Sequence, residues 1–298
     1  MSRRKGIALC YPYEEQRLSK WMATTNFIIA QPKLDGERCR AIIENKQAQL
    51  LSSEGNEILS VPHINEELAR FYRGPSVELD GELYVHGMDF PTIHSIVGRT
   101  ANLHSDYAEM QLHLFDIIAP TLDQEHRLEL LTRHHELPHV KIVPTIHITP
   151  DRIEELISRW TYDGYEGIIL RHPGALYKRH LDKEYRSPYM MKFKPGRRDI
   201  YQITGVAEEI SKEGTPKGMT GALYCTNPSD PDSGATFKVS CGATTHEKKR
   251  EWWQKREELM GKYVVVSYQH LSKYRVPRHG RVNLETDLIL NNTSPFNY

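Results

Sequence analysis

The sequence predicts a protein of the mixed α+β class that is divided into two domains. Its 298 residues are enough for two domains of ordinary size, each with its own hydrophobic core. Apolar and β-branched runs alternate with turn residues over about residues 26–90, and helical patterns then alternate with strand-like runs up to residue 194. Pro195 and Gly196 interrupt this pattern, and short strand candidates dominate the remainder of the chain.

The elements of the first domain follow from local patterns. Apolar runs bounded by turn residues predict strands over residues 26–33, 38–44, 49–52, 76–85, 111–118, 141–148, 165–171 and 188–194. Helical periodicity predicts helices near residues 65–72 and over residues 121–137. A further helix is expected from Pro150 to Gly164, because Thr149 suits the N-cap and proline suits the first helical position. We place this domain at residues 1–197.

The second domain, residues 198–298, contains more strands than helices. Strands are expected over residues 201–209, 221–226, 235–240 and 263–271, and one helix is expected over residues 245–260, ending at Gly261. About five strands with one helix fit a small Greek-key barrel of the OB type, although the composition fits other small β domains as well.

The composition excludes several classes of protein. A hydrophobic content of 39% is typical of a folded chain, and no run approaches the roughly 20 apolar residues of a membrane-spanning helix. The N-terminal residues lack the apolar centre of a secretory signal, so we expect a cytoplasmic protein with no membrane partner. Lys+Arg and Asp+Glu both total 39, so any site for a polyanion is local. The four cysteines form no CxxC pair, so neither a structural zinc nor a disulfide framework is expected.

A lysine at the end of an apolar strand is the most informative feature of the sequence. Lys33 is followed by Asp35, Gly36 and Arg38. A neutral lysine amine is a nucleophile, and burial and neighbouring cations favour the neutral form. The Asp-Gly pair suits a tight turn that aims the side chain. On this segment alone, an exposed charged hairpin turn is the alternative.

Further motifs follow Lys33 in order along the chain. They are ELDGEL at residues 78–83, HLFD at 113–116, YEGIILR at 165–171 and MKFK at 191–194. The Lys-x-Asp-Gly-x-Arg segment resembles the nucleotide-binding motif of covalent nucleotidyltransferases, which include ATP-dependent DNA ligases, RNA ligases and mRNA capping guanylyltransferases. Each later segment resembles the next motif of that superfamily. The resemblance implies a nucleotidyltransferase (adenylation) domain of antiparallel sheets with flanking helices, followed by a small OB-fold β-barrel domain.

The resemblance also implies roles for individual residues. Lys33 attacks the α-phosphorus of ATP and becomes covalently linked to AMP, while neighbouring cations lower the pKa of Lys33 and neutralise phosphate oxygens. Phe115 stacks on adenine, with core packing as its alternative role. The residues expected at the nucleotide are Gln31, Lys33, Arg38, Glu82, Phe115, Lys192 and Lys194. Those expected at a divalent cation, Mg²⁺ or Mn²⁺, are Glu82 and Glu166, and those in support are Asp35 and Arg171.

The later segments favour DNA as the substrate. YEGIILR resembles the DNA ligase version of its motif, and residues 252–278 resemble the OB domain of small ATP-dependent DNA ligases. Residues 171–200 contain nine basic and three acidic side chains, which suits a surface that follows phosphates, with a solvated loop as the alternative. The residues expected to bind DNA are Lys178, Arg179, Arg197, Arg198 and Arg278.

Two segments depart from the DNA ligase pattern. Many DNA ligases carry Ser-Arg after the second strand of this region, whereas residues 51–55 here read Leu-Ser-Ser-Glu-Gly. An arginine expected near the nick phosphate is therefore missing or displaced. The last motif, residues 276–281, keeps its basic charge but has His279 where an aromatic residue often lies.

The sequence therefore predicts a minimal, monomeric ATP-dependent DNA ligase. The resemblance implies that it seals 5′-phosphate/3′-hydroxyl nicks in duplex DNA through lysyl-AMP at Lys33 and an adenylated DNA end. One alternative is an RNA-joining or RNA-repair ligase that shares the first chemical step. The other is a non-enzymatic nucleic-acid-binding OB protein, against which Glu82 and Glu166 argue, because carboxylates repel phosphate unless a metal intervenes.

Overall fold

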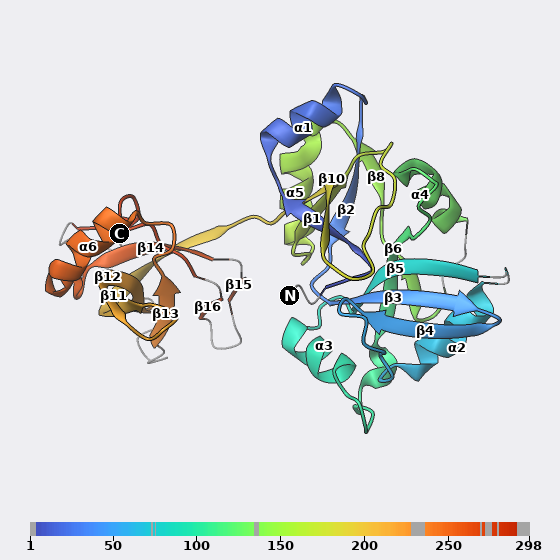
Figure 1. Cartoon of the computed structure of the whole chain (residues 1–298), viewed down its shortest axis with the longest axis horizontal. Coiled ribbons are helices and arrows are strands. Elements are labelled where there is room, and N and C mark those ends of the chain that lie inside the picture. The colour runs from blue at the N-terminus through green and yellow to red at the C-terminus, as the bar shows by residue number, and fades with distance from the viewer. Residues whose placement is uncertain are drawn as a thin grey trace. The chain divides into compact units, whose positions relative to one another are not determined.

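A computed structural model of the chain describes residues 4–72, 74, 76–133, 137–227, 236–268, 270–271, 276–278 and 280–290 (Figure 1). The chain divides into two compact units, residues 1–194 and 195–298. The boundary expected after residue 197 falls at the start of the first strand of the second unit. Among the residues described, no helix combines the length and apolar character needed to cross a membrane.

The first of two five-stranded sheets in the first unit contains the strand that ends at Lys33. Its strand order is β1 (Ala8–Pro12), β10 (Tyr185–Phe193), β9 (Gly167–Arg171), β2 (Ile28–Lys33) and β8 (Ile146–Ile148). β1 runs parallel to β10, and the other pairs are antiparallel. Apolar side chains of this sheet pack against α1 (Glu15–Met22) and α5 (Ile153–Tyr162), which follows the 3₁₀ turn η2 (Pro150–Arg152) (Figure 1).

The second sheet of this unit has its own core. Its order is β4 (Gln47–Ser52), β3 (Glu37–Glu44), β5 (Ser76–Tyr84), β6 (Gln111–Ile117) and β7 (Val140–Ile142), with β7 parallel to β6. The helical elements of this region are α2 (Pro62–Phe71), α3 (Phe90–Val97), η1 (Tyr107–Glu109) and α4 (Gln124–Thr132). Buried side chains from the strands and from α2, α3 and α4 form one continuous apolar cluster. Each sheet thus contains one parallel pair, whereas the sequence analysis expected antiparallel sheets.

Residues 141–148 differ from the prediction of one strand. They form β7 and β8, which belong to different sheets. Pro144 lies between the two strands and has no N–H to donate to a ladder, so the chain leaves one sheet there and enters the other. Thr145 lies in this connection next to Gln31, whose side-chain amide donates to the Thr145 hydroxyl at 2.9 Å.

Four elements that the structure describes in the first unit escaped the sequence analysis: β1, α1, α3 and the short 3₁₀ helix η1. A local signal was present for α3, because Asp89 accepts a hydrogen bond from the Thr92 N–H at 2.8 Å and Pro91 occupies the first turn. β1 is short, and its pairing partner β10 lies more than 170 residues later in the chain. Pairing at that sequence separation leaves no local pattern to detect.

The second unit is built on a third five-stranded sheet. Its order is β13 (Thr236–Ser240), β12 (Pro216–Thr226), β11 (Arg197–Ile210), β14 (Tyr263–Tyr268) and β17 (Leu288–Ile289). The remaining elements are α6 (His246–Gln254), η4 (Arg256–Leu259) and the pair β15 (His270–Leu271) and β16 (Pro277–Arg278). This sheet is open and does not close into a barrel, although Arg281 forms single β-bridges to Ser240 of β13 and to Ser267 of β14.

Candidate active site

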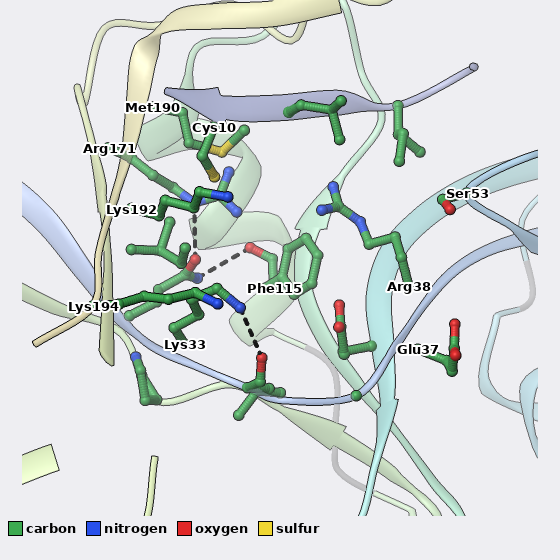
Figure 2. A pocket seen from close by; sticks show the side chains of 18 of the residues that line it. Cys10, Lys33, Glu37, Arg38, Ser53, Phe115, Arg171, Met190, Lys192 and Lys194 are labelled. Carbon is green, nitrogen blue, oxygen red and sulfur yellow. Dashed lines mark hydrogen bonds between the residues drawn. The ribbon is translucent and has the colours of Figure 1, made fainter. Parts of the chain in front are cut away.

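A cavity of about 330 Å³ opens in the first unit, and residues of both its sheets line it (Figure 2). β1, β2, β9 and β10 contribute from one sheet, and β3, β5 and β6 contribute from the other. The volume lies at the lower end of the range typical of small-molecule sites. The predicted residues among those lining it are Gln31, Lys33, Arg38, Glu82, Phe115, Arg171, Lys192 and Lys194.

Strand register places the charged residues of separate motifs side by side. Lys33 ends β2 opposite Gly167 of β9, and the N–H of Glu166 donates to the carbonyl of Lys33 at 3.0 Å. In the second sheet, Arg38 of β3 lies directly opposite Glu82 of β5. Antiparallel neighbours of this kind lie within side-chain reach of each other. Three motifs that are far apart in the sequence therefore meet at the end of β2.

Glycine is required where these strands approach each other. A Cβ at Gly36 would lie 2.3 Å from the carbonyl oxygen of Leu83, and a Cβ at Gly167 would lie 2.2 Å from that of Phe193. Both contacts are with backbone, which cannot move aside as the end of a side chain can. The glycines of the Asp-Gly and Glu-Gly pairs thus allow the Lys33 turn to close on β5 and allow β9 to close on β10.

The amine of Lys33 is an ammonium paired with Glu166. One carboxylate oxygen of Glu166 binds Lys33 Nζ and the other binds Lys194 Nζ. Burial lowers the pKa of Lys33, but Glu166, Glu82 and Asp35 outweigh it, and the net shift is upward. The sequence analysis expected neighbouring cations to lower this pKa. That expectation was wrong for the resting site, because the acidic groups lie nearer than the sequence revealed.

Lys192 differs from the other two lysines. Within the part of the chain that the structure describes, its amine forms no ion pair or hydrogen bond. Its pKa is lowered by burial and by the positive charges of Lys194 and Lys33. A cavity that holds this amine without an acidic partner is suited to an anion such as a phosphate group.

Glu82 is the second carboxylate of the site. Burial raises its pKa to about 7, against the opposing effects of Arg38 and Lys33. Its carboxylate forms no hydrogen bond or ion pair with any residue that the structure describes. Those residues also contain no group of three or more His, Cys, Asp or Glu side chains arranged to hold a metal. Two carboxylates, Glu82 and Glu166, are a donor set of the kind that suits Mg²⁺, which keeps water ligands and binds through one or two carboxylates and a phosphate.

Arg38 and Phe115 form one wall of the cavity. Arg38 donates from Nε and Nη2 to Asp80 at 2.7 and 2.6 Å, and Tyr177 also donates to Asp80, at 2.5 Å. The Arg38 guanidinium lies 4.6 Å from the centre of the Phe115 ring. Phe115 is 8% exposed and belongs to the apolar cluster of the second sheet, yet it also lines the cavity. Both roles considered for Phe115 are thus compatible with its position.

Arg171 belongs to a buried polar network behind this wall. It donates to Gln31 at 2.8 Å and to Asp116 at 2.9 Å, and Asp116 also accepts from Arg127 at 2.8 Å. The amide nitrogen of Gln31 donates to the Phe115 carbonyl at 3.1 Å and to Thr145. Both amide hydrogens of Gln31 are therefore bound by protein, so Gln31 fixes the wall and has no hydrogen left for an adenine edge.

Comparison with known protein families identifies the chain. Residues 10–194 match the model of the ATP-dependent DNA ligase domain, and residues 213–283 match the model of the DNA ligase OB-like domain. The first match alone covers more than half of the 298 residues. The chain belongs to the ATP-dependent DNA ligase family.

The fold of this ligase is similar to solved structures of other DNA ligases. A structure from work on Lig E DNA ligases and DNA binding with a minimal scaffold matches with a TM-score of 0.71 at 22% identity, over 95% of this chain and 99% of that one. The bacteriophage T7 ATP-dependent DNA ligase in complex with ATP matches with a TM-score of 0.54 at 17% identity, over 94% of this chain and 98% of that one. The Chlorella virus DNA ligase-adenylate matches with a TM-score of 0.50 at 20% identity, over 94% of this chain and 97% of that one. No curated protein matches the sequence.

The residues expected to bind DNA lie in different surroundings in the ligase. Lys178 and Arg197 are exposed. Arg179 forms a bidentate ion pair with Glu78, at 2.5 Å for each bond, and Arg198 pairs with Asp287 at 2.7 Å while its side chain stays 59% exposed. The backbone of Arg278 is part of β16, but its side chain and His279 lie outside the described part of the chain.

Several residues that line the cavity of the ligase were not identified from the sequence. They include Arg4, Cys10, Glu37, Ser53 and Arg186. Arg186 was counted in the basic segment 171–200 without a role, and it donates to the Cys10 carbonyl at 2.9 Å. Arg4 and Cys10 precede every motif. The pairing of β1 with β10 brings Cys10 to the site, and the bond from the Lys5 N–H to the Ser53 carbonyl holds the chain next to Arg4. Contacts between such distant segments leave no signal in the sequence, so these residues were not identified.

Proposed function

We propose that this ligase seals nicks in duplex DNA, with Lys33 as the residue that receives AMP from ATP. The observation that supports this proposal is the position of one amine. Lys33 Nζ lies in the cavity with Lys192 and Lys194, and the aromatic ring of Phe115 lies in the same wall as Arg38. Glu166 pairs with both Lys33 and Lys194. The arrangement joins a nucleophile, a set of phosphate-binding cations and a surface on which a base can stack.

In the first step, Lys33 Nζ attacks the α-phosphorus of ATP. A nitrogen–phosphorus bond forms, the bond to the bridging oxygen breaks, and pyrophosphate leaves with its electron pair. Because the amine is an ammonium paired with Glu166, it must lose a proton and separate from that carboxylate before attack. Lys192 and Lys194 stabilise the charge that develops on the phosphate oxygens.

A divalent cation fits the acidic residues of the site. Glu82 and Glu166 are the carboxylates that would hold it, and Mg²⁺ would supply positive charge to the phosphate oxygens. Glu82 has no partner of its own among the described residues, and it is ionised once the pH exceeds about 7. Glu166 is ionised in the resting site, because Lys33 and Lys194 overcome the effect of burial and lower its pKa.

Two further transfers complete the reaction. An oxygen of the DNA 5′-phosphate attacks the phosphorus of lysyl-AMP, which restores the Lys33 amine and leaves adenylated DNA. The 3′-hydroxyl then attacks the DNA phosphorus, the phosphodiester forms and AMP departs with its electron pair. Both acceptors are parts of a nicked duplex, which is the partner we propose for this protein.

The test measures whether label from α-labelled ATP becomes covalently attached to the protein. With Mg²⁺, we expect label to become attached to the wild-type protein and not to Lys33→Ala, because the substitution removes the amine that we propose as the nucleophile. Arg70→Ala, which removes an exposed arginine of α2 outside the cavity, is expected to retain the labelling. Labelling of Lys33→Ala, or no labelling of the wild type, contradicts the proposal.

Nicked substrates then test the choice of DNA. The same nick is prepared in duplex DNA and in duplex RNA, and sealing is measured with ATP, GTP or NAD. We expect ATP-dependent sealing of the DNA nick. Sealing of the RNA nick alone would indicate the RNA ligase alternative, and salt-sensitive binding without any adduct would indicate a non-enzymatic binding protein.

A further inference from the structure

The N-terminal segment docks beside the part of the cavity where the sequence lacks an expected arginine. The N–H of Lys5 donates to the carbonyl of Ser53 at 3.0 Å, and the N–H of Gly6 donates to that of His180 at 2.6 Å. Ile7 is 2% exposed, and Ala8, at 4%, donates its N–H to the Tyr177 hydroxyl at 3.2 Å. These contacts fix the backbone immediately after Arg4.

Arg4 lines the same cavity as Lys33 and Ser53, and its side chain is exposed. Figure 2 shows Ser53, Arg38 and Glu37 to one side of Phe115 and the lysines to the other. Arg4 forms no ion pair or hydrogen bond with any residue that the structure describes. Its guanidinium is thus exposed at the cavity, and the next residue along the chain, Lys5, is hydrogen-bonded to Ser53.

Three arginines near this segment that the structure describes, Arg38, Arg40 and Arg179, are already engaged by carboxylates. Arg38 directs Nε and Nη2 at Asp80. Arg40 pairs with Glu78 at 2.9 Å, and Arg179 pairs with the same carboxylate at 2.5 Å. Glu37 adds negative charge to this part of the cavity wall. Compared with these three arginines, Arg4 offers an incoming phosphate group a guanidinium that no described carboxylate engages.

We propose that Arg4 binds the 5′-phosphate of the DNA strand to be joined, a role that rests on the DNA ligase activity proposed above. A guanidinium binds the oxygens of a terminal phosphate in a bidentate manner. Lys33, Lys192 and Lys194 serve the phosphates of the nucleotide deeper in the cavity, whereas an exposed residue at the mouth is accessible to a duplex. Arg4 supplies from the N-terminus the charge that residues 51–55 lack.

The experiment separates the steps of the reaction in Arg4→Ala, Arg4→Lys and the control Arg70→Ala. Attachment of AMP to the protein is measured with α-labelled ATP. Transfer of AMP from pre-adenylated protein to a nick with a 5′-phosphate is then measured in a single turnover. We expect Arg4→Ala to transfer AMP roughly 10- to 100-fold more slowly, the effect of losing a hydrogen bond to a charged group. Its own adenylation is expected to stay within about twofold of the wild type. Arg4→Lys is expected to recover part of the transfer rate, because it restores the charge without the fork of donors.

Two results would overturn the role of Arg4. Unchanged transfer in Arg4→Ala would show that this residue does not bind the 5′-phosphate. An equal loss in self-adenylation and in transfer would place Arg4 at the phosphates of ATP instead. Both results leave the proposed function intact as long as the wild type becomes adenylated and seals the nick. Absence of either reaction in the wild type would contradict the proposed function itself.

Discussion

The carboxylate of Glu166 holds the ammonium group of Lys33, the residue proposed as the nucleophile, in an ion pair. Lys194 binds the other oxygen of the same carboxylate. The proposed nucleophile is thus held in a protonated, unreactive form. Activation requires that Glu166 exchange this partner for another cation, so the reactivity of Lys33 depends on a residue 133 positions away in the chain.

The pH dependence of Lys33 reactivity tests this ion pair in protein free of metal. Although burial lowers the pKa of Lys33, Glu166 contributes to a net increase. Glu166→Gln removes this charge, so the pKa of Lys33 is expected to fall and modification by an amine-selective reagent to begin at lower pH. Exposed Lys20 is the internal control, and its profile is expected to be the same in both proteins. A Lys33 profile unmoved by the substitution would contradict the assigned pairing.

The raised pKa of Glu82 predicts that the free energy of unfolding falls as the pH rises. The measurement is made in EDTA, so that no metal ion is bound. Burial raises its pKa from the ordinary 4.5 to about 7 in the fold, so the native state binds the proton more tightly than the unfolded chain does. Its favourable contribution is complete below pH 4.5 and is lost as the pH rises to about 7. Glu82→Gln is therefore expected to gain unfolding free energy relative to wild type over this interval. Urea denaturation provides the measurement, with Glu129→Gln, an exposed residue, as the control. A difference between wild type and variant that stays constant with pH would refute this assignment.

The buried Asp116 network predicts a large loss of stability. Asp116 is fully buried and accepts hydrogen bonds from both Arg127 and Arg171. Asp116→Asn leaves two buried guanidinium groups without their carboxylate, so we expect a loss of about 3–5 kcal/mol in the free energy of unfolding. Glu129→Gln breaks an exposed pair with Arg133 and is expected to cost less than about 1 kcal/mol. Comparable losses in the two variants would show that the network contributes little.

Cys10 provides a reporter for occupation of the cavity. It lines the cavity, whereas Cys39, Cys225 and Cys241 are fully buried. Burial raises the pKa of the Cys10 thiol, although nearby Arg171, Arg38 and Lys33 oppose the effect, so alkylation is expected to be slow and to accelerate as the pH rises. ATP is expected to slow alkylation of Cys10, as measured by peptide mass spectrometry. Inorganic phosphate, which lacks the adenine base, is expected to protect Cys10 less. Equal rates with and without ATP would place the nucleotide elsewhere.

The sequence by itself predicted several of the residues that meet in the cavity. Lys33, Glu82 and Phe115 belong to short motifs in strands or at their ends, and each motif carries its own signal of residue types and spacing. The two-unit organisation and most of the longer strands were predictable for the same reason. Local patterns of apolar residues, glycine and proline are sufficient for features of this kind.

Only the tertiary structure decided the protonation state of Lys33 and which further residues line the cavity. The sign of the Lys33 pKa shift depends on the distance to Glu166, which register between β2 and β9 sets. The presence of Cys10 depends on β1 pairing with β10, and that of Arg4 depends on the hydrogen bonds that Lys5 and Gly6 form with Ser53 and His180. Electrostatic interaction varies with separation in space, and contacts between distant segments leave no periodicity in the sequence.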